Sequence, residues 1–163
     1  MPLPPPLPPV SSSHISHPRS PSPAARHLGR AGLLPFVACA AVAVLGPAGW
    51  RGAAAMALAA YAAVIVSFLG GIHWGLAMRQ MPEPSPLLLG WGVAPSLLAW
   101  PALLLPIGPA LGLLGAGLLL CYAADRRLYP AHGVAAWLGL RVQLTAVASL
   151  CCWVAAAAPL WWR

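Results

Sequence analysis

Residues 52–78 read GAAAMALAAYAAVIVSFLGGIHWGLAM, an apolar run that contains no Asp, Glu, Lys or Arg. About 20 apolar residues are enough for a helix to cross the roughly 30 Å hydrocarbon core of a bilayer. The run exceeds that length and is flanked by Arg51 and Arg79. It predicts a transmembrane helix.

Four further segments approach the length of a span: residues 31–49, 87–105, 107–124 and 142–162. The middle two are separated only by the turn at 106–109, where two prolines and a glycine interrupt a helix. The predicted fold is therefore all-α, a membrane bundle of five transmembrane helices within residues 28–163. Residues 1–27 hold nine prolines, and because proline cannot continue a helix, this tail is predicted to be disordered.

The composition excludes a soluble domain. Hydrophobic residues make up 60% of the chain and charged residues only 7%, against about 25% charged in a typical soluble domain. The net charge of +7 comes from nine arginines scattered between apolar runs, whereas a nucleic-acid surface needs a clustered basic face. The four cysteines form no Cys-x-x-Cys pair, so neither a metal site nor a disulfide framework is predicted.

The arginines also predict the orientation. With five spans and the N-terminus inside, seven arginines fall on the inner side (19, 26, 30, 79, 126, 127 and 141) and two on the outer side (51 and 163). This is the positive-inside bias, so the N-terminus is predicted inside and the C-terminus outside. Arginine without lysine, with abundant Ala, Gly and Pro, is typical of GC-rich bacterial genomes. The predicted location is a bacterial inner membrane, with the mitochondrial inner membrane as the alternative.

Small residues recur at every fourth position of the second span. Ala59, Ala63, Ser67, Gly71 and Gly75 form one stripe, with Gly70 beside it, and Gly108 and Gly112 repeat the spacing in the fourth span. Such stripes let helices approach closely. Packing inside the monomer is the commoner use, and a seam with another chain is the alternative.

His73 is the one ionisable side chain well inside a predicted span, and such groups are functional candidates by default. It shares a helix side with Val66 and Gly70, roughly opposite Gly71. Asp125 and Arg126 end the fourth span, and Arg141, Gln143 and Thr145 open the fifth. Asp125 and Arg141 could pair or be solvated. The candidate cluster is His73, Trp74, Asp125 and Arg141 at the inner mouth of the bundle.

No catalytic motif is present: the chain lacks a Gly-x-Ser-x-Gly elbow, a phosphate-binding loop, His-Glu-x-x-His and paired carboxylates. With only two acids, Glu83 and Asp125, carboxylate chemistry is hard to build. We expect no enzyme, no cofactor and no metal.

Several stretches carry a family resemblance. They are residues 28–36, the block SFLGGIHWG at 67–75, APSLLAW at 94–100, and Trp137, Leu140–Arg141 and Leu144–Thr145. Together they resemble a family of small bacterial inner-membrane proteins of unknown function that is related to mitochondrial transmembrane protein 69. The resemblance implies five spans and brings no activity, substrate or cofactor.

Three functional hypotheses follow. The first is an accessory or assembly factor that packs with other membrane subunits or with itself, motivated by the small-residue stripe. The second is an oligomeric channel or transporter for small solutes, with a site near His73 and a third span broken at Pro95 and Pro101, because discontinuous helices line transport sites. Haem or quinone binding is the third.

Overall fold

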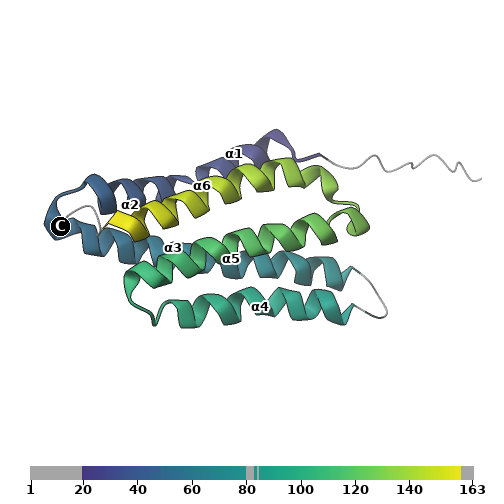
Figure 1. The fold of residues 1–163 in the computed structure, drawn as a ribbon. Helices are drawn as coiled ribbons and strands as arrows, with labels where there is room; N and C mark the ends of the chain where they lie inside the picture. Colours follow the sequence, from purple (N-terminus) through teal and green to yellow (C-terminus); the bar gives the residue numbers. More distant parts are fainter. Residues whose placement is uncertain (1–19, 80–82, 84, 159–163) are drawn as a thin grey trace, which may run out of the picture.

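The computed structural model describes residues 20–79, 83 and 85–158. Within them the regular structure is entirely helical, with a 3-10 turn at Pro130–His132 and another at Ala135–Trp137. Figure 1 shows α1 and α2 following one another in one direction and the later helices alternating in direction. The α-helices are α1 (Pro23–Ala31), α2 (Leu34–Leu45), α3 (Ala48–Met78), α4 (Pro86–Ala102), α5 (Ile107–Leu128) and α6 (Leu138–Ala157). The predicted all-α membrane bundle is confirmed.

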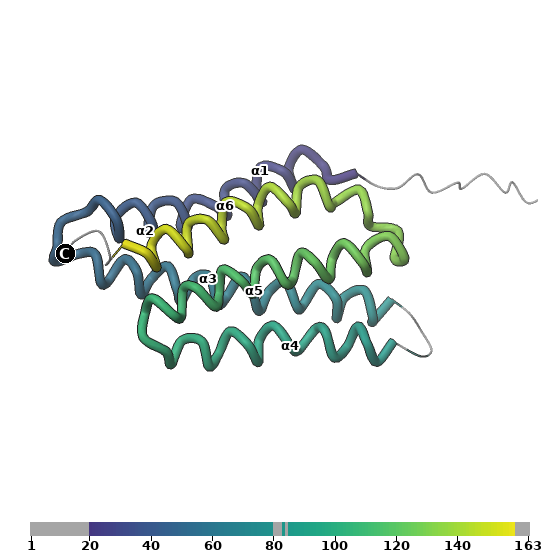
Figure 2. The backbone as a smooth tube through the Cα atoms, in the orientation of Figure 1, coloured from purple at the N-terminus to yellow at the C-terminus, as the bar shows by residue number. Residues whose placement is uncertain are grey.

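Four helical segments in the described part of the chain are long and apolar enough to cross a bilayer: Pro23–Leu45, Ala48–Met78, Ile107–Leu128 and Ala135–Ala157. The fifth, α4, is apolar but has 17 residues, about 25 Å at helical rise. It lies along α3 and α5 (Figure 2). The predicted span of residues 142–162 begins earlier, at Leu138, and its last four residues lie outside the described ones.

The first span differs from its prediction at its N-terminal end. Residues 23–27, predicted to belong to a disordered tail, form the start of α1. The reason is local: Ser22 accepts a hydrogen bond from the Ala25 N–H at 3.2 Å, and Pro23 occupies the first helical position, where its missing N–H costs nothing. A short break before Leu34 then separates α1 from α2. The Tyr61 hydroxyl donates to the Gly32 carbonyl at 2.9 Å, which holds this break against α3.

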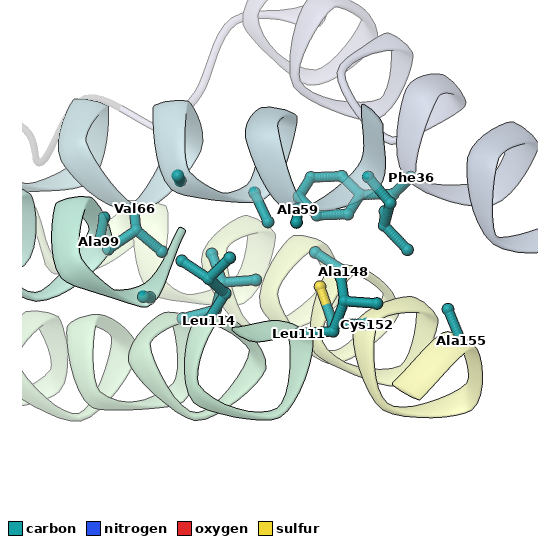
Figure 3. Packing of buried hydrophobic residues seen from close by; sticks show 14 of the residues in the cluster. Phe36, Ala59, Val66, Ala99, Leu111, Leu114, Ala148, Cys152 and Ala155 are labelled. Atoms are coloured by element: carbon teal, nitrogen blue, oxygen red, sulfur yellow. The ribbon is translucent and has the colours of Figure 1, made fainter. Parts of the chain in front are cut away.

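Helix α3 is the centre of the bundle and contacts α2, α4, α5 and α6. The core around it consists mainly of alanine and leucine, and Figure 3 shows Ala59 and Val66 of α3 with Leu111 and Leu114 of α5 and Ala148 and Cys152 of α6. Such small side chains let the helices lie close together. Because hydrocarbon surrounds the bundle, many large apolar side chains remain exposed, among them Phe68, Leu97 and Leu150.

Helix α4 is continuous, contrary to the prediction of a span broken at Pro95 and Pro101. Both prolines lie inside the helix Pro86–Ala102. Pro95 is buried where α4 crosses α3, and an added Cβ on Gly70 would meet the Gly92 carbonyl and the Pro95 ring. Neighbouring helices can accommodate proline in a membrane helix in this way. The broken helix that motivated the transport hypothesis is absent.

The small-residue stripe divides between two environments. Ala59 and Ala63 are buried in the core, whereas Gly71 and Gly75 are exposed, and a Cβ added to either glycine would meet no atom within 4 Å. Ser67 is partly exposed. Residues four apart on an ideal helix are 40° apart around its axis, so the stripe winds from the inside to the outside of the bundle.

The fourth-span glycines have ordinary surroundings. A Cβ at Gly108 would lie 3.7 Å from the Ala156 carbonyl oxygen, and one at Gly112 would meet nothing within 4 Å. Gly115 is more tightly surrounded, since a Cβ there would lie 2.6 Å from Trp153 Nε1. Trp153 donates to the Gly112 carbonyl at 3.2 Å, and Ser149 donates to that of Gly115 at 3.1 Å.

Charged residues of the described part concentrate at one end of the bundle. That end carries the start of α1, the end of α3 and the connection from α5 to α6 (Figure 1). It holds Arg79, Arg126 and Arg127, whereas Arg51 lies at the opposite end, where its Nε donates to the Gly46 carbonyl at 2.7 Å. We call the arginine-rich end the basic end.

Candidate functional site

Three of the four predicted site residues meet inside the bundle. His73 comes from α3, Asp125 from the last turn of α5 and Arg141 from the first turn of α6. His73 and Asp125 are fully enclosed, and 8% of Arg141 is exposed. We call these three residues the polar cluster. The cluster lies near the basic end; His73 and Asp125 are closed off from the surface, whereas Arg141 also borders a cavity between α1, α3 and α6.

Asp125 and Arg141 form a buried ion pair. Arg141 donates from Nε to Asp125 Oδ2 at 2.7 Å, and its Nη2 lies 2.7 Å from the same oxygen. Of the two sequence alternatives, pairing and solvation, the structure has the pair. It joins consecutive helices at the base of the α5–α6 hairpin. Because the carboxylate neutralises the guanidinium, both charges can lie away from water.

His73 connects this pair to the central helix. Its Nε2 lies 3.3 Å from Asp125 Oδ1, and its Nδ1 lies 3.2 Å from the Leu69 carbonyl oxygen. The predicted helix side is confirmed, since Val66, Gly70 and His73 are buried while Gly71 is exposed. A carbonyl and a carboxylate are both acceptors, so each contact needs a proton on the ring nitrogen that faces it, and in this structure Nε2 and Asp125 Oδ1 make no hydrogen bond. With one proton on the ring, the cluster has no net charge and one of the two contacts lacks its donor.

Tyr129 belongs to the same site and was not predicted from the sequence. It follows α5 in the connection to α6, is 3% exposed, and its ring centroid lies 6.0 Å from that of His73. Its side chain interacts with Arg141 and Asp125, and burial together with the nearby Asp125 charge raises the pKa of Tyr129 to about 12. The hydroxyl therefore stays protonated. Its spacing of four residues from Asp125 was the available signal, because residues i and i+4 share a helix face.

Trp74 does not join the polar cluster. Its ring lies over Gly92 of α4, where an added Cβ would overlap it, and its Nε1 donates to the Leu89 carbonyl at 3.1 Å. With 44% of its surface exposed, it packs α3 against α4 at the edge of the bundle. Neighbouring positions on a helix point about 100° apart, which explains why His73 and Trp74 face different helices.

Thr145 lies one turn beyond Arg141 on α6 and is 3% exposed. Its Oγ1 has no hydrogen-bond partner among the described residues. Gln143, two residues before it, is exposed. Of the polar groups predicted to open the fifth span, Arg141 and Thr145 therefore face inward.

The arrangement is that of a closed polar site. No group of three or more His, Cys, Asp or Glu side chains in the described part could hold a metal ion. The carboxylate of Asp125 has both oxygens directed at cationic or potentially cationic side chains. Such a cluster joins α3, α5 and α6.

Comparison with known proteins gives the chain a family. The family described as "Protein of unknown function (DUF3429)" matches residues 21–157. Transmembrane protein 69 of Xenopus tropicalis is 39% identical over 135 residues, which cover 76% of this chain and 50% of that protein. The chain thus spans half the length of this relative. No solved structure matches it.

The family match covers all the described helices and includes the polar cluster. The predicted relationship to transmembrane protein 69 is confirmed. The chain belongs to the DUF3429 family of membrane proteins of unknown function.

Proposed function

We propose that this chain is a non-enzymatic accessory or assembly protein that packs against another membrane protein through the exposed face of α3. The observation that carries the proposal is the composition of that face. Five small residues of α3 are exposed on this face: Ala53, Ala57, Ala60, Gly71 and Gly75. Among the exposed residues of α3 after Arg51, the large ones are Met56, Val64, Phe68, Trp74 and Met78.

A face of this kind suits a second helix. Lipid tails are as apolar as leucine, so helices gain little from burying apolar area in a bilayer and associate through close packing instead. The open space at Gly71 and Gly75 would let another backbone approach α3 closely. The same face continues toward the N-terminal end of α3 through Ala60, Ala57 and Ala53, so one partner helix could follow several turns.

The polar cluster supports a structural rather than a catalytic role. His73 and Asp125 have no exposed surface, and the groups face one another rather than a water-filled cleft. A general acid or base must come within hydrogen-bond reach of a substrate proton. The enclosed cluster instead joins the three helices and would keep the α3 face in a fixed position.

Site-specific photocrosslinking in cells tests the proposal. A photoreactive side chain is placed at Gly71, and a control side chain at Leu150, which is 60% exposed on α6. We expect an adduct with a second membrane protein from position 71 and none from position 150. Equal adducts from both positions, or no protein adduct from position 71, would contradict the proposal. If the only adduct is with a second copy of this chain, the proposal of a different partner protein is wrong and the α3 face mediates self-association.

A matched pair of variants adds a quantitative test. Gly71→Leu and Gly75→Leu together would fill the α3 face without touching the monomer's core, and Ala116→Leu places the same side chain at an exposed position of α5. The double variant should lose the adduct or the co-purifying protein while its thermal stability is retained. The α5 variant should keep both. Loss of association in both proteins would point to a non-specific effect and overturn the assignment to α3.

A further inference from the structure

Two apolar cavities lie side by side between α1, α3 and α6. Their volumes are about 320 Å³ and 370 Å³, near the lower end of the 300–1,000 Å³ typical of small-molecule sites. They share part of their lining: Gly29, Phe68, Leu69, Arg141 and Leu144. The first extends toward Phe36 and Leu118, and the second toward Tyr129 and Trp137. We call the pair the α1–α6 cavity.

The polar atoms of the α1–α6 cavity lie together. Arg141 lines both halves, and Thr145 lines the first. The two residues are four apart on α6, so their side chains lie on the same helix face, one turn apart. Only 3% of Thr145 is exposed, and its Oγ1 has no hydrogen-bond partner among the described residues. A buried hydroxyl without a partner is costly, so this atom indicates a missing acceptor.

The charge of the site restricts what that acceptor can be. Asp125 already neutralises Arg141 through contacts at 2.7 Å, and the cluster has no net charge while His73 carries one proton. An anionic head group would bring a charge that nothing in the site balances, and it would face the Asp125 carboxylate one helix away. A neutral acceptor such as a carbonyl brings no such charge and can accept from Thr145 Oγ1–H and from the guanidinium.

The remaining lining indicates the rest of the ligand. Phe68, Tyr129 and Trp137 contribute aromatic faces to the second half of the cavity, where a planar ring could pack against them. The first half is lined mainly by aliphatic side chains and Phe36, which suits an apolar chain. Phe68 is 64% exposed on the lipid-facing side of α3, so a ligand dissolved in the bilayer could enter between the helices.

We propose that the α1–α6 cavity binds a membrane-dissolved molecule with a neutral, carbonyl-bearing ring and an apolar chain, the chemistry of a lipid quinone. Thr145 and Arg141 donate to a ring carbonyl, and the ring lies where the two halves meet, beside Arg141 and Phe68, which line both. Gly29 lines both halves, and a Cβ added there would already lie 3.3 Å from Leu144, so a leucine side chain would have to extend into the cavity. Ligand binding here does not require the partner proposed for α3, and Phe68 is the residue that borders both the cavity and the exposed face of α3.

Equilibrium binding of radiolabelled decylubiquinone to the full chain in nanodiscs tests this proposal, with empty nanodiscs as the control for partitioning into lipid. We expect saturable binding above partitioning. Thr145→Val keeps the side chain's size but removes the donor, and it should weaken binding about fivefold to tenfold. Thr145→Ser retains the hydroxyl and should bind within about twofold of the original chain. Gly29→Leu should abolish saturable binding by filling the cavity.

Competition identifies the chemistry of the occupant. Excess unlabelled decylubiquinone should displace the label, whereas decylbenzene, which has a similar chain and a ring without carbonyls, should not. Equal competition by decylbenzene would mean that the cavity binds apolar chains and does not recognise the ring carbonyls, which would overturn the proposal. Binding no greater than to empty nanodiscs would overturn it as well. So would Thr145→Val and Gly29→Leu proteins that bind like the original chain.

Discussion

Removing Asp125 should destabilise the bundle more than most single substitutions. Asp125→Ala takes away both contacts to Arg141 at 2.7 Å and the contact to His73 at 3.3 Å. It leaves a guanidinium that is 8% exposed without its counter-charge. Breaking a buried ion pair on one side costs about 3–5 kcal/mol. For a protein of this size, each kcal/mol shifts the unfolding midpoint by about 2–4 °C, so we expect a loss of about 6–20 °C.

A double-mutant cycle separates the ion pair from general damage to the core. Arg141→Met leaves Asp125 unpaired and should cost a similar free energy, whereas replacement of both partners removes both buried charges. The double variant should therefore be less destabilised than the sum of the singles, by about 2 kcal/mol or more. Asp125→Asn keeps the shape of the side chain and shows how much of the loss is due to charge.

The chain carries its own reporter for this measurement. Cys121 and Cys152 are free thiols, 2% and 0% exposed, and a thiol-reactive dye would reach them as the bundle unfolds in detergent. Thermal ramps of the four cycle members give the midpoints. Additive effects of the single substitutions, or an Asp125→Ala midpoint within about 2 °C of the original, would refute the account of the polar cluster as the link between α3, α5 and α6.

Three further substitutions, one of them with a matched control, test the packing of the helices. Gly70→Val should cost about 1–3 kcal/mol, because its side chain would meet the Gly92 carbonyl at the α3–α4 crossing, whereas Gly75→Val on the open face of the same helix should leave the midpoint nearly unchanged. Ser149→Ala removes the 3.1 Å bond to the Gly115 carbonyl and should cost about 1 kcal/mol in the same thermal assay. Tyr61→Phe removes the 2.9 Å bond to Gly32, so hydrogen exchange of the amides around the α1–α2 break should become faster while the core helices stay protected.

The helices were predictable because hydrocarbon demands long apolar segments, and the chain supplies them between arginines. The Asp125–Arg141 pair was foreseeable as one of two alternatives, because these charges end one helix and begin the next. The start of α1 was also encoded: Ser22 followed by Pro23 is a helix N-terminus signal. The proline content of the preceding residues concealed it.

The partners of individual side chains were beyond sequence analysis. Helix α3 is apolar around most of its circumference, so its pattern does not fix which side faces α5, and the contact between His73 and Asp125 depends on that rotation. Gly92 and Gly115 each lie under a tryptophan from another helix, and neither belongs to a repeated spacing. Such single close approaches depend on which helices are neighbours, which composition and periodicity do not specify.

We predict a bundle of five membrane-crossing helices with the two ends of the chain in opposite compartments. Reporters that are active on only one side of a bacterial inner membrane, fused before residue 20 and after residue 158, test it most directly. We predict that a cytoplasmic reporter is active only at the N-terminal position and that a periplasmic reporter is active only at the C-terminal one, in line with the arginines at the basic end. Activity of the same reporter at both positions would contradict the account.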